Sequence, residues 1–488
     1  MRLKLRRSCG LGALVVGAVV LLHCATNPAT GKKQISLIGE GREIEMGREA
    51  AKEISASMGL YDDDALSAYV DSVGQRLAAT SERSHLTWTF RVVDDAAVNA
   101  FALPGGYIYV TRGILAHLNS EAELAGVLGH EIGHVTGRHS VNRLSKAQLG
   151  GLVLGVGTVA AQAASSSWGS AVDTGGQVLF AGLFSRFSRD HERQADDLGL
   201  RYMTRSSYDP HQMPGVFAML EAVSSKAAGG RVPDWLATHP NPEARGRRSV
   251  AAVAALGDTS GGRVGAEVYL GRLESLTFGA DPREGYFRES LFLHPEMRFQ
   301  FDFPDGWKTQ NQKTQVAAIN PGEDVAISLR LADAASAEEG AREFLAQEGM
   351  SGGRRWTRRV NGLAASGGGW TVETEEKAYT GQVVFVEHSD AVFALVAYGL
   401  EEDFARQRER AVAALKSFRV LEDPAVLAVE PFRLEVVRLA SATTLAALAV
   451  TMKSPVSIEI LTVVNRREPD AQIPAGSLVK MVVGNPPP

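Results

Sequence analysis

Two histidines and a glutamate at a fixed spacing are the residues of this sequence best suited to chemistry. The stretch AGVLGHEIGHVTGRH contains His130, Glu131 and His134 in the pattern HExxH. Side chains four residues apart share one face of a helix, so the two imidazoles could hold one zinc ion. Glu131 would then lie beside a metal-activated water. The simpler alternative is an amphipathic helix whose histidines pack or form hydrogen bonds.

The residues around the motif predict that it is helical. Ser120 and Glu123 form the pattern S-x-x-E, which is typical of a capping box at a helix start. Apolar residues follow at three- and four-residue steps: Leu124, Val127, Leu128, Ile132 and Val135. His117 and His139 flank the motif without continuing its spacing, and we interpret both as structural.

A second polar stretch, FSRDHERQADDLGLRYM, could complete a metal site. A catalytic zinc ion has three protein ligands and an open position. Glu192 and Asp196 are four residues apart and would share one face of a second helix. Glu192 could bind the metal, and Asp196 could accept a hydrogen bond from a ligand histidine. The alternatives are a solvated charged face, or His191 as the ligand, although its side chain would point about 100° away from Glu192.

The segment before the motif, NAFALPGGYIYVTRGIL, predicts two strands joined by a turn. PGG is a turn signal, and YIYV is rich in residues that favour strands. The NAFA part would be an edge strand, to which an extended peptide could bind by strand addition. Asn99 and Ala102 are therefore candidate substrate contacts, and an ordinary hairpin is the simpler interpretation.

Taken together, these motifs resemble one superfamily of peptidases. HExxH followed by SRDHERQAD resembles the gluzincin metallopeptidases that include the HtpX and CAAX prenyl proteases. The stretches CATNPATGKKQISLI, NAFALPGGYIYVTRGIL and ATHPNPEAR are similar to the soluble branch, periplasmic lipoproteins of the beta-barrel assembly-enhancing protease type. The resemblance covers residues 24–257. It implies an endopeptidase with one Zn²⁺ per chain, acting on unfolded or misassembled envelope proteins.

The resemblance also implies roles for single residues. His130, His134 and Glu192 would bind the metal, with Asp196 as the partner of a ligand histidine. Glu131 would take a proton from water and pass it to the leaving amine.

Two residues of the ATHPNPEAR motif have open roles. His239 would lie near the metal, where it could donate a hydrogen bond to the developing oxyanion or occupy the open position and keep the enzyme latent. It could instead be a loop histidine beside Pro240 that helps to start the next helix. Arg245 is a candidate contact for a substrate carboxylate or oxyanion, or a charge on a helix surface.

The start of the chain is typical of a secretory signal. MRLKLRR is basic, and residues 11–22 are a short apolar run. Cys24 follows as in a bacterial lipobox, although His23 replaces the usual small residue. We expect residues 1–23 to be a lipoprotein signal peptide and Cys24 to carry the lipid. Ordinary cleavage and an uncleaved anchor are the alternatives.

The expected location follows from the same residues. Ala25 is not the aspartate that retains such lipoproteins in the inner membrane, so we expect a periplasmic protein anchored in the inner leaflet of the outer membrane. Cys9 would leave with the signal peptide, which excludes a disulfide within the chain and metal sites with cysteine ligands.

The chain has 488 residues, more than one ordinary core, and we predict an α+β multidomain protein. Residues 24–257 would form a mainly helical peptidase domain with a small edge-strand sheet, and residues 258–285 a Gly-rich linker. Residues 286–422 alternate strands and helices and are similar to PsbP/Mog1-like domains. Residues 430–485 resemble a βααβ LysM repeat, which would bind peptidoglycan, although Ala442-Thr443 replaces the usual Gly-Asp.

Charge and hydropathy limit the remaining classes. The net charge of −5 gives no reason to expect nucleic acid as a partner. Residues 149–184 are apolar, but their first apolar run is shorter than the ~20 residues that span a bilayer. We expect a buried or mobile helical hairpin there, with a lid or a membrane contact as alternatives.

Two rival functions stay open at this point. One is a chaperone or assembly factor with a latent protease site. The other is a prenyl-type intramembrane protease, which would need several membrane spans.

Overall fold

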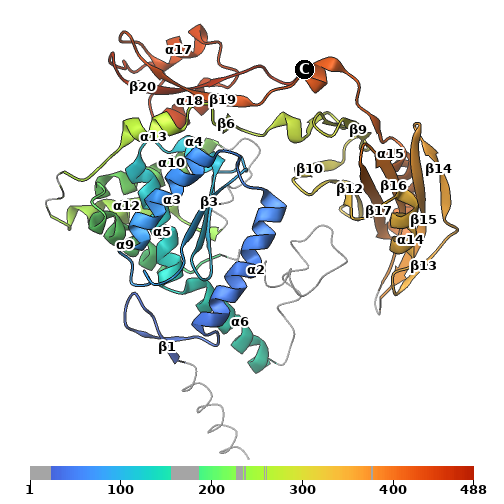
Figure 1. Cartoon of the computed structure of the whole chain (residues 1–488), viewed down its shortest axis with the longest axis horizontal. Helices are drawn as coiled ribbons and strands as arrows, with labels where there is room; N and C mark the ends of the chain where they lie inside the picture. Colours follow the sequence, from blue (N-terminus) through green and yellow to red (C-terminus); the bar gives the residue numbers. More distant parts are fainter. Residues whose placement is uncertain are drawn as a thin grey trace, which may run out of the picture. The chain divides into compact units, whose positions relative to one another are not determined.

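The computed structural model describes residues 24–154, 186–226, 235, 238–257, 259, 261–374 and 377–488 (Figure 1). The expected signal peptide and most of the apolar segment 149–184 lie outside these residues. The chain divides into two compact units. The first runs to Gly279 and includes Arg433–Val483, and the second comprises Ala280–Phe432 and Gly484–Pro488. In the part of the chain that is described, no helix is both long and apolar enough to cross a bilayer.

Helix α5 (Glu121–Thr136), which carries the HExxH motif, is the centre of the first unit, and all 16 of its residues are buried. Its neighbours include α3 and α9, which pack along it (Figure 1). Ser120 caps the helix by accepting a hydrogen bond from the backbone N–H of Glu123 at 3.1 Å, which confirms the predicted start. The remaining long helices of this unit are α2 (Glu40–Met58), α3 (Asp64–Ala78), α6 (His139–Leu154), α9 (Arg189–Arg205), α10 (Met213–Lys226) and α12 (Pro242–Ala254).

Close contact between α5 and α9 depends on small residues. A Cβ atom on Gly129 of α5 would lie 3.1 Å from the carbonyl oxygen of Gly199 on α9. A Cβ atom on Gly199 would in turn lie 2.9 Å from the backbone nitrogen of His130. Because both positions lack a side chain, the two helices approach closely enough for the polar face of α9 to reach the histidines of α5.

The predicted strand pair before the motif is present. Strand β5 (Tyr107–Thr111) lies between β3 (Thr89–Val93), which runs parallel to it, and β4 (Ala100–Leu103), which runs antiparallel. Strand β4 is therefore an edge strand, as predicted. The turn between β4 and β5 needs glycine at Gly105, where φ is +80° and a Cβ atom would lie 2.7 Å from the Cα of Ile44.

Two short segments outside this core also belong to the first unit. The N-terminal hairpin pairs β1 (Cys24–Thr26) with β2 (Lys33–Ile35). The predicted linker contains helix α13 (Ala266–Arg272) and strand β6 (Thr277–Phe278).

The C-terminal segment Arg433–Val483 packs within the first unit. It follows the expected βααβ order: β19 (Phe432–Arg438), α17 (Leu445–Thr451), α18 (Ile458–Asn465) and β20 (Leu478–Val483). Strand β19 lies between β20 and β6 in one sheet. The Nζ atom of Lys480, on β20, is buried and donates to the carbonyl oxygens of Ala116 and Leu118 at 2.6 and 2.7 Å. These carbonyls lie at the end of α4 (Arg112–His117), just before helix α5 begins.

The second unit is an antiparallel sheet with one helix on each face, an α+β arrangement as predicted. Its strands are β10 (Lys308–Gln312), β11 (Gln315–Ile319), β12 (Val325–Ala332), β13 (Met350–Gly352), β14 (Trp356–Val360), β15 (Leu363–Glu373), β16 (Ala378–His388) and β17 (Ala391–Leu400). Val383 and Phe385 pack with α14 (Ala337–Leu345), whereas Val384 and Val386 pack with α15 (Glu401–Leu415). Because successive strand residues point to opposite faces, the two helices cover different faces of the sheet.

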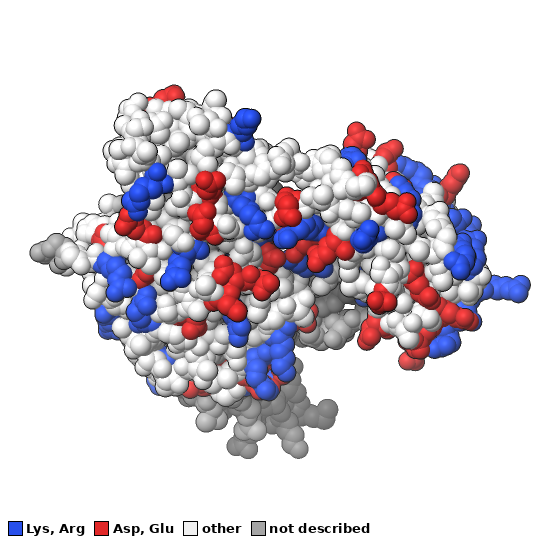
Figure 2. Space-filling model, turned by 45° about the horizontal axis from the view of Figure 1, so that its top comes forward, with Lys and Arg blue, Asp and Glu red and all other residues white. Residues whose placement is uncertain are grey.

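A smaller sheet completes the second unit, in the order β18 (Arg419–Val420), β9 (Phe299–Asp302), β8 (Leu291–His294) and β7 (Tyr286–Arg288). Figure 2 shows acidic and basic side chains interspersed over the face in view.

Candidate metal centre

Four side chains from three parts of the first unit converge on one point. The Nε2 atom of His130 lies 3.0 Å from the Nε2 atom of His134 and 3.3 Å from the Nδ1 atom of His239. The Glu192 carboxylate lies 3.1 Å from His239 Nδ1 and 3.5 Å from His134 Nε2. One ligand atom from each residue lies within 4.8 Å of the others, and all four residues are buried. The structure thus brings together the three predicted ligands, and adds His239.

The proton positions in this cluster leave lone pairs facing each other. His130 Nδ1 lies 3.0 Å from the Oδ1 atom of Asp196, which only accepts, so the proton of this imidazole is on Nδ1. His134 Nδ1 lies 3.0 Å from His139 Nδ1, and His139 Nε2 lies 2.8 Å from Gln194 Oε1. The amide oxygen therefore fixes the proton of His139 on Nε2, and His134 donates from Nδ1.

This arrangement fits a divalent cation. The Nε2 atoms of His130 and His134 both carry lone pairs and are 3.0 Å apart, which is repulsive unless a cation lies between them. Two ligand nitrogens on one tetrahedral zinc ion are about 3.3 Å apart, given Zn–N bonds of ~2.0–2.1 Å. Imidazole nitrogens with a carboxylate oxygen are the ligands that such a site uses, and each ligand histidine has an outer hydrogen-bond partner.

Arg245, on α12, balances the carboxylates of the cluster. Its Nη2 and Nε atoms donate to Asp196 at 2.6 and 3.0 Å, and its Nη1 atom lies 2.8 Å from Glu192 Oε2. Burial alone would raise the pKa of Glu192, but His239 and Arg245 lower it to about 2. The pKa of Asp196 is lowered as well, again mainly by Arg245 against the effect of burial. Both carboxylates are therefore ionised. The substrate contact expected for Arg245 stays a prediction.

Glu131 differs from these carboxylates because no strong donor holds it. Its side chain is buried, and the nearest histidine atom, His239 Nε2, lies 3.7 Å from Oε1. Burial, helped by the charge of Glu192, raises the pKa of Glu131 to about 8, against His130, Arg245 and the backbone of Ala102. A buried carboxylate with this proton affinity beside the ligand cluster is suited to accept a proton from a water molecule.

The edge strand β4 passes next to Glu131. Helix α5 and β4 are in contact, and the backbone of Ala102 is one of the groups that lower the pKa of Glu131 against the effect of burial. The Oδ1 atom of Asn99, just before β4, is buried and has no hydrogen-bond partner in the described part of the chain. The two predicted substrate contacts therefore lie on the strand that borders the site, Ala102, and directly before it, Asn99.

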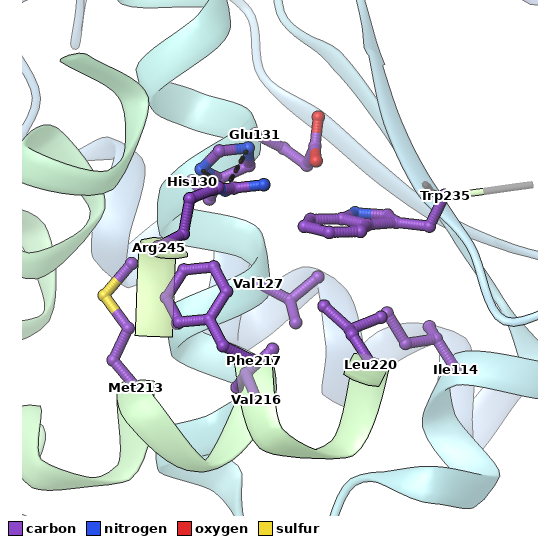
Figure 3. Close-up of a pocket in the computed structure, with 11 residues that line it drawn as sticks. Ile114, Val127, His130, Glu131, Met213, Val216, Phe217, Leu220, Trp235 and Arg245 are labelled. Atoms are coloured by element: carbon purple, nitrogen blue, oxygen red, sulfur yellow. Dashed lines mark hydrogen bonds between the residues drawn. The ribbon is translucent and has the colours of Figure 1, made fainter. Parts of the chain in front are cut away.

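An apolar pocket opens beside His130 and Glu131 (Figure 3). Its other lining residues are Ile114, Gly126, Val127, Met213, Val216, Phe217, Leu220, Trp235 and Arg245. Trp235 also stacks on His239, with ring centroids 4.7 Å apart and an interplanar angle of 21°. Nothing in the sequence predicted this role for Trp235 beyond its position four residues before His239.

His139 is the residue that sequence reasoning misjudged most. Counted along one continuous helix, it would project away from His130, and we interpreted it as structural. Arg138 interrupts the helix with a φ of +55°, and α6 begins at His139. The chain therefore turns, and His139 lies against His134. Burial lowers the pKa of His139 to about 3, which keeps it neutral. The sequence feature that could have indicated this position of His139 is the pair Arg138-His139, which closely follows the motif.

His117, the other flanking histidine, is structural as interpreted. It is half-buried, and its Nδ1 atom bonds to the carbonyl oxygen of Gly113 at 2.7 Å.

Comparison with known proteins agrees with this geometry. Residues 64–250 match the profile of Peptidase family M48. The chain is 30% identical over 224 residues to the beta-barrel assembly-enhancing protease of Escherichia coli (strain K12), which covers 45% of each protein. It is 30% identical over 246 residues to the mitochondrial metalloendopeptidase OMA1 of Schizosaccharomyces pombe, which covers 49% of this chain and 69% of that one.

The matched regions cover only part of the length of the relatives. The chain spans a little under half the length of the enterobacterial relatives that it matches. Among solved structures, cyanobacterial PsbP from Synechocystis sp. PCC 6803 is similar to 28% of this chain and 94% of its own, with 14% identity and a TM-score of 0.23. The profile match includes the residues that build the metal centre. The chain therefore belongs to peptidase family M48, and residues 64–250 form its metallopeptidase domain.

Proposed function

We propose that the protein is a zinc-dependent endopeptidase. The observation that carries this proposal is the convergence of His130, His134 and Glu192 on one point beside Glu131, a buried carboxylate without a strong donor. A zinc ion held by the three ligands would act as a Lewis acid that activates water and polarises the scissile carbonyl. The family supports a metal-dependent peptidase, and zinc is the metal that this set of donors favours.

The side chains around the site divide the work of catalysis. Glu131 accepts the proton of the attacking water and passes it to the leaving amine. Asp196 and His139 hold His130 and His134 in the orientation that ligation needs. Strand β4 offers its free edge to an extended peptide, with Asn99 and Ala102 as contacts.

The substrates that we propose are unfolded or misassembled envelope proteins. Binding by strand addition requires an extended segment, and only unfolded or misassembled chains offer such segments readily. The name of the E. coli relative, a beta-barrel assembly-enhancing protease, supports the same class. We further propose a periplasmic location, lipidation of Cys24 with anchoring in the outer membrane, and peptidoglycan binding by the LysM-like residues 430–485.

A second candidate function rests on the position of His239. Its Nδ1 atom lies 3.3 Å from His130 Nε2 and 3.1 Å from Glu192 Oε1, so His239 could bind the metal together with the three ligands. In this arrangement the site has four protein donors, as structural zinc sites have. This favours a latent protease, or an assembly factor whose binding modules do the work, over a site that is always open.

One experiment tests the proposed activity. The mature protein, the Glu131→Gln variant and the matched control Glu221→Gln, an exposed residue on α10, are assayed for casein cleavage and for bound zinc by mass spectrometry. We expect about one zinc ion in each. Cleavage should fall at least about 10²–10⁴-fold in Glu131→Gln alone.

The other outcomes are equally informative. If all three proteins bind zinc and none cleaves, His239→Ala should release activity in a latent enzyme. If that variant is inactive too, the assembly-factor alternative is favoured. A wild-type protein that binds no zinc would show the ligand assignment to be wrong.

A further inference from the structure

The ligand His134 is the first member of a chain of hydrogen bonds that leaves the metal centre. His134 Nδ1 lies 3.0 Å from His139 Nδ1, and His139 Nε2 lies 2.8 Å from Gln194 Oε1. The amide nitrogen of Gln194 donates to Asn27 Oδ1 at 3.4 Å. Asn27, His134 and His139 are all buried, with 6%, 2% and 1% of their surface exposed. The chain thus joins α5, α6, α9 and the N-terminal hairpin.

The backbone fixes the orientation of the last member, Asn27. Its Oδ1 atom accepts from the backbone N–H groups of Ala29 and Thr30 at 2.9 and 3.3 Å. Its Nδ2 atom donates to the carbonyl oxygen of Gly137, the residue that ends α5, at 3.3 Å. Since an N–H donates and a carbonyl accepts, neither end of this amide can be exchanged with the other.

The orientation of Asn27 passes along the chain step by step. The Asn27 amide pairs with the Gln194 amide: Asn27 Oδ1 accepts from Gln194 Nε2 and Asn27 Nδ2 donates to Gln194 Oε1, each at 3.4 Å, which holds the Gln194 oxygen toward His139. This oxygen accepts from His139 Nε2, so the lone pair of His139 is on Nδ1. His134 must then donate from Nδ1, and its Nε2 lone pair points into the cluster. A reversed Gln194 amide would reverse each donor in turn and place a proton on the atom that should bind the metal.

We propose that Asn27, Gln194 and His139 are positioning residues that fix the proton of His134, so that the seating of the N-terminal hairpin sets the metal affinity of the site. The inference rests on the proposed metal site and adds a structural input to it. The hairpin is the segment next to Cys24, so anything that displaces the hairpin would also loosen the metal.

The test measures metal affinity instead of activity. Zn²⁺ binding is measured by competition with a chromophoric chelator, and the Co²⁺ absorption spectrum reports the geometry of the ligands. Gln194→Ala removes the acceptor for His139, and we expect its Zn²⁺ affinity to fall about 10- to 100-fold. Asn27→Ala leaves the Gln194 amide free to reverse, so we expect a smaller loss and an altered Co²⁺ spectrum.

Two further variants separate positioning from general damage. Gln194→Glu keeps an acceptor toward His139 and should retain wild-type affinity or exceed it, although it loses the donor to Asn27. Gln212→Ala is the matched control, because Gln212 is also half-buried but bonds to Asp209, away from the cluster. Thermal unfolding of each metal-free protein shows whether the variant is folded. If Gln194→Ala does not fold, the variants Gln194→Glu and Asn27→Ala still test the inference.

The results that would overturn the inference are specific. Affinities of Asn27→Ala and Gln194→Ala within twofold of wild type would do so, as would a loss in Gln194→Glu equal to that in Gln194→Ala. Failure of the proposed function looks different, since the wild-type protein itself would then bind no Zn²⁺.

Discussion

The two compact units differ most in what they bury. Among its described residues, the first unit buries many charged and histidine side chains. They are Glu43, Arg83, Arg112, Glu121, Glu123, His130, Glu131, His134, Arg138, His139, Glu192, Asp196, His239, Arg245 and Lys480. In the described part of the second unit only Asp281 and His388 belong to this group. Its core is built instead from aromatic and aliphatic side chains such as Phe299, Phe393 and Phe418.

The difference separates a unit built for chemistry from one built for stability. Burying an ion costs free energy unless partners repay it, so a protein keeps buried ions where they are paired or needed. In the first unit some are paired for structure: Arg83 donates to Glu43 at 2.6 Å, and Arg138 donates to the same carboxylate at 2.8 Å. Without a cation, the interactions within the cluster around His130 offset only part of the free-energy cost of burying its charged groups. The second unit has no such cluster in its described residues.

The largest expected difference between the units is their response to a chelator. Removal of the metal should destabilise the first unit and leave the second unchanged, because among the described residues only the first unit has converging metal donors. At a metal concentration of 1,000 times Kd, the expected loss is about 4 kcal/mol. Calorimetry with and without 1,10-phenanthroline should show one unfolding transition move down and one stay. Two transitions that shift together would contradict the separation.

The second prediction concerns which segment the peptidase can lose. Residues 280–432 follow β6 and end at the first residue of β19, its neighbour in one sheet of the first unit, so a short linker can join Gly279 to Arg433. We expect this excision to keep casein cleavage at the same order of magnitude, since compact units fold as separate bodies.

Removal of residues 433–488 serves as the matching deletion. It takes away β19 and β20 from the first unit and exposes the carbonyls that Lys480 holds. We expect a poorly folded, inactive protein, measured by circular dichroism and by casein cleavage. An active protein after this deletion would show that the C-terminal segment is an independent module.

Much of the local structure could be predicted from the sequence. The Ser120 cap, the apolar steps along α5 and the PGG turn act over a few residues, so a short stretch of sequence contains the whole cause. The shared face of Glu192 and Asp196 is local in the same sense. These elements are present as predicted.

Features that depend on contacts between distant residues could not be predicted in this way. The pairing of Arg245 with Asp196 spans 49 positions, and Lys480 reaches Ala116 across 364. Gly137 is a local signal for the end of α5, but the direction in which the chain turns at Arg138, and so the contact of His139 with His134, depends on the packing around it. The order of elements in residues 433–483 was predictable, but their packing within the first unit was not.

The third prediction compares a fully buried arginine with a half-buried one. Arg83 is fully buried and holds Glu43, Glu40 and the carbonyl oxygen of Val135. Arg83→Met should destabilise the first unit by about 3–5 kcal/mol, since it leaves a buried carboxylate with less compensation. In the second unit, Arg419 pairs with Asp302 at the surface, and Arg419→Met should cost about 0–1 kcal/mol. Urea unfolding of each variant measures both, and equal losses would contradict the comparison.

The smallest expected effect is at Lys480, where a buried ammonium group joins the C-terminal segment to the residues before α5. Burial lowers the pKa of Lys480 well below its usual range, so the side chain is held at a cost. Lys480→Met removes that cost but leaves the carbonyl oxygens of Ala116 and Leu118 without their donor. Two buried acceptors without partners should outweigh the relief, and we expect a net loss of about 1–3 kcal/mol in the unfolding of the first unit.

Lys480→Arg and the exposed control Lys453→Met complete this measurement. Lys480→Arg keeps the donors but is too large for the fully buried site, so it should destabilise as well. Lys453→Met should stay within about 0.5 kcal/mol of wild type, as surface substitutions usually do. If Lys480→Met were instead more stable than wild type, the buried charge would serve the specificity of docking and not stability. The first unit would then contain a third class of buried ion, besides those paired for structure and those at the metal centre.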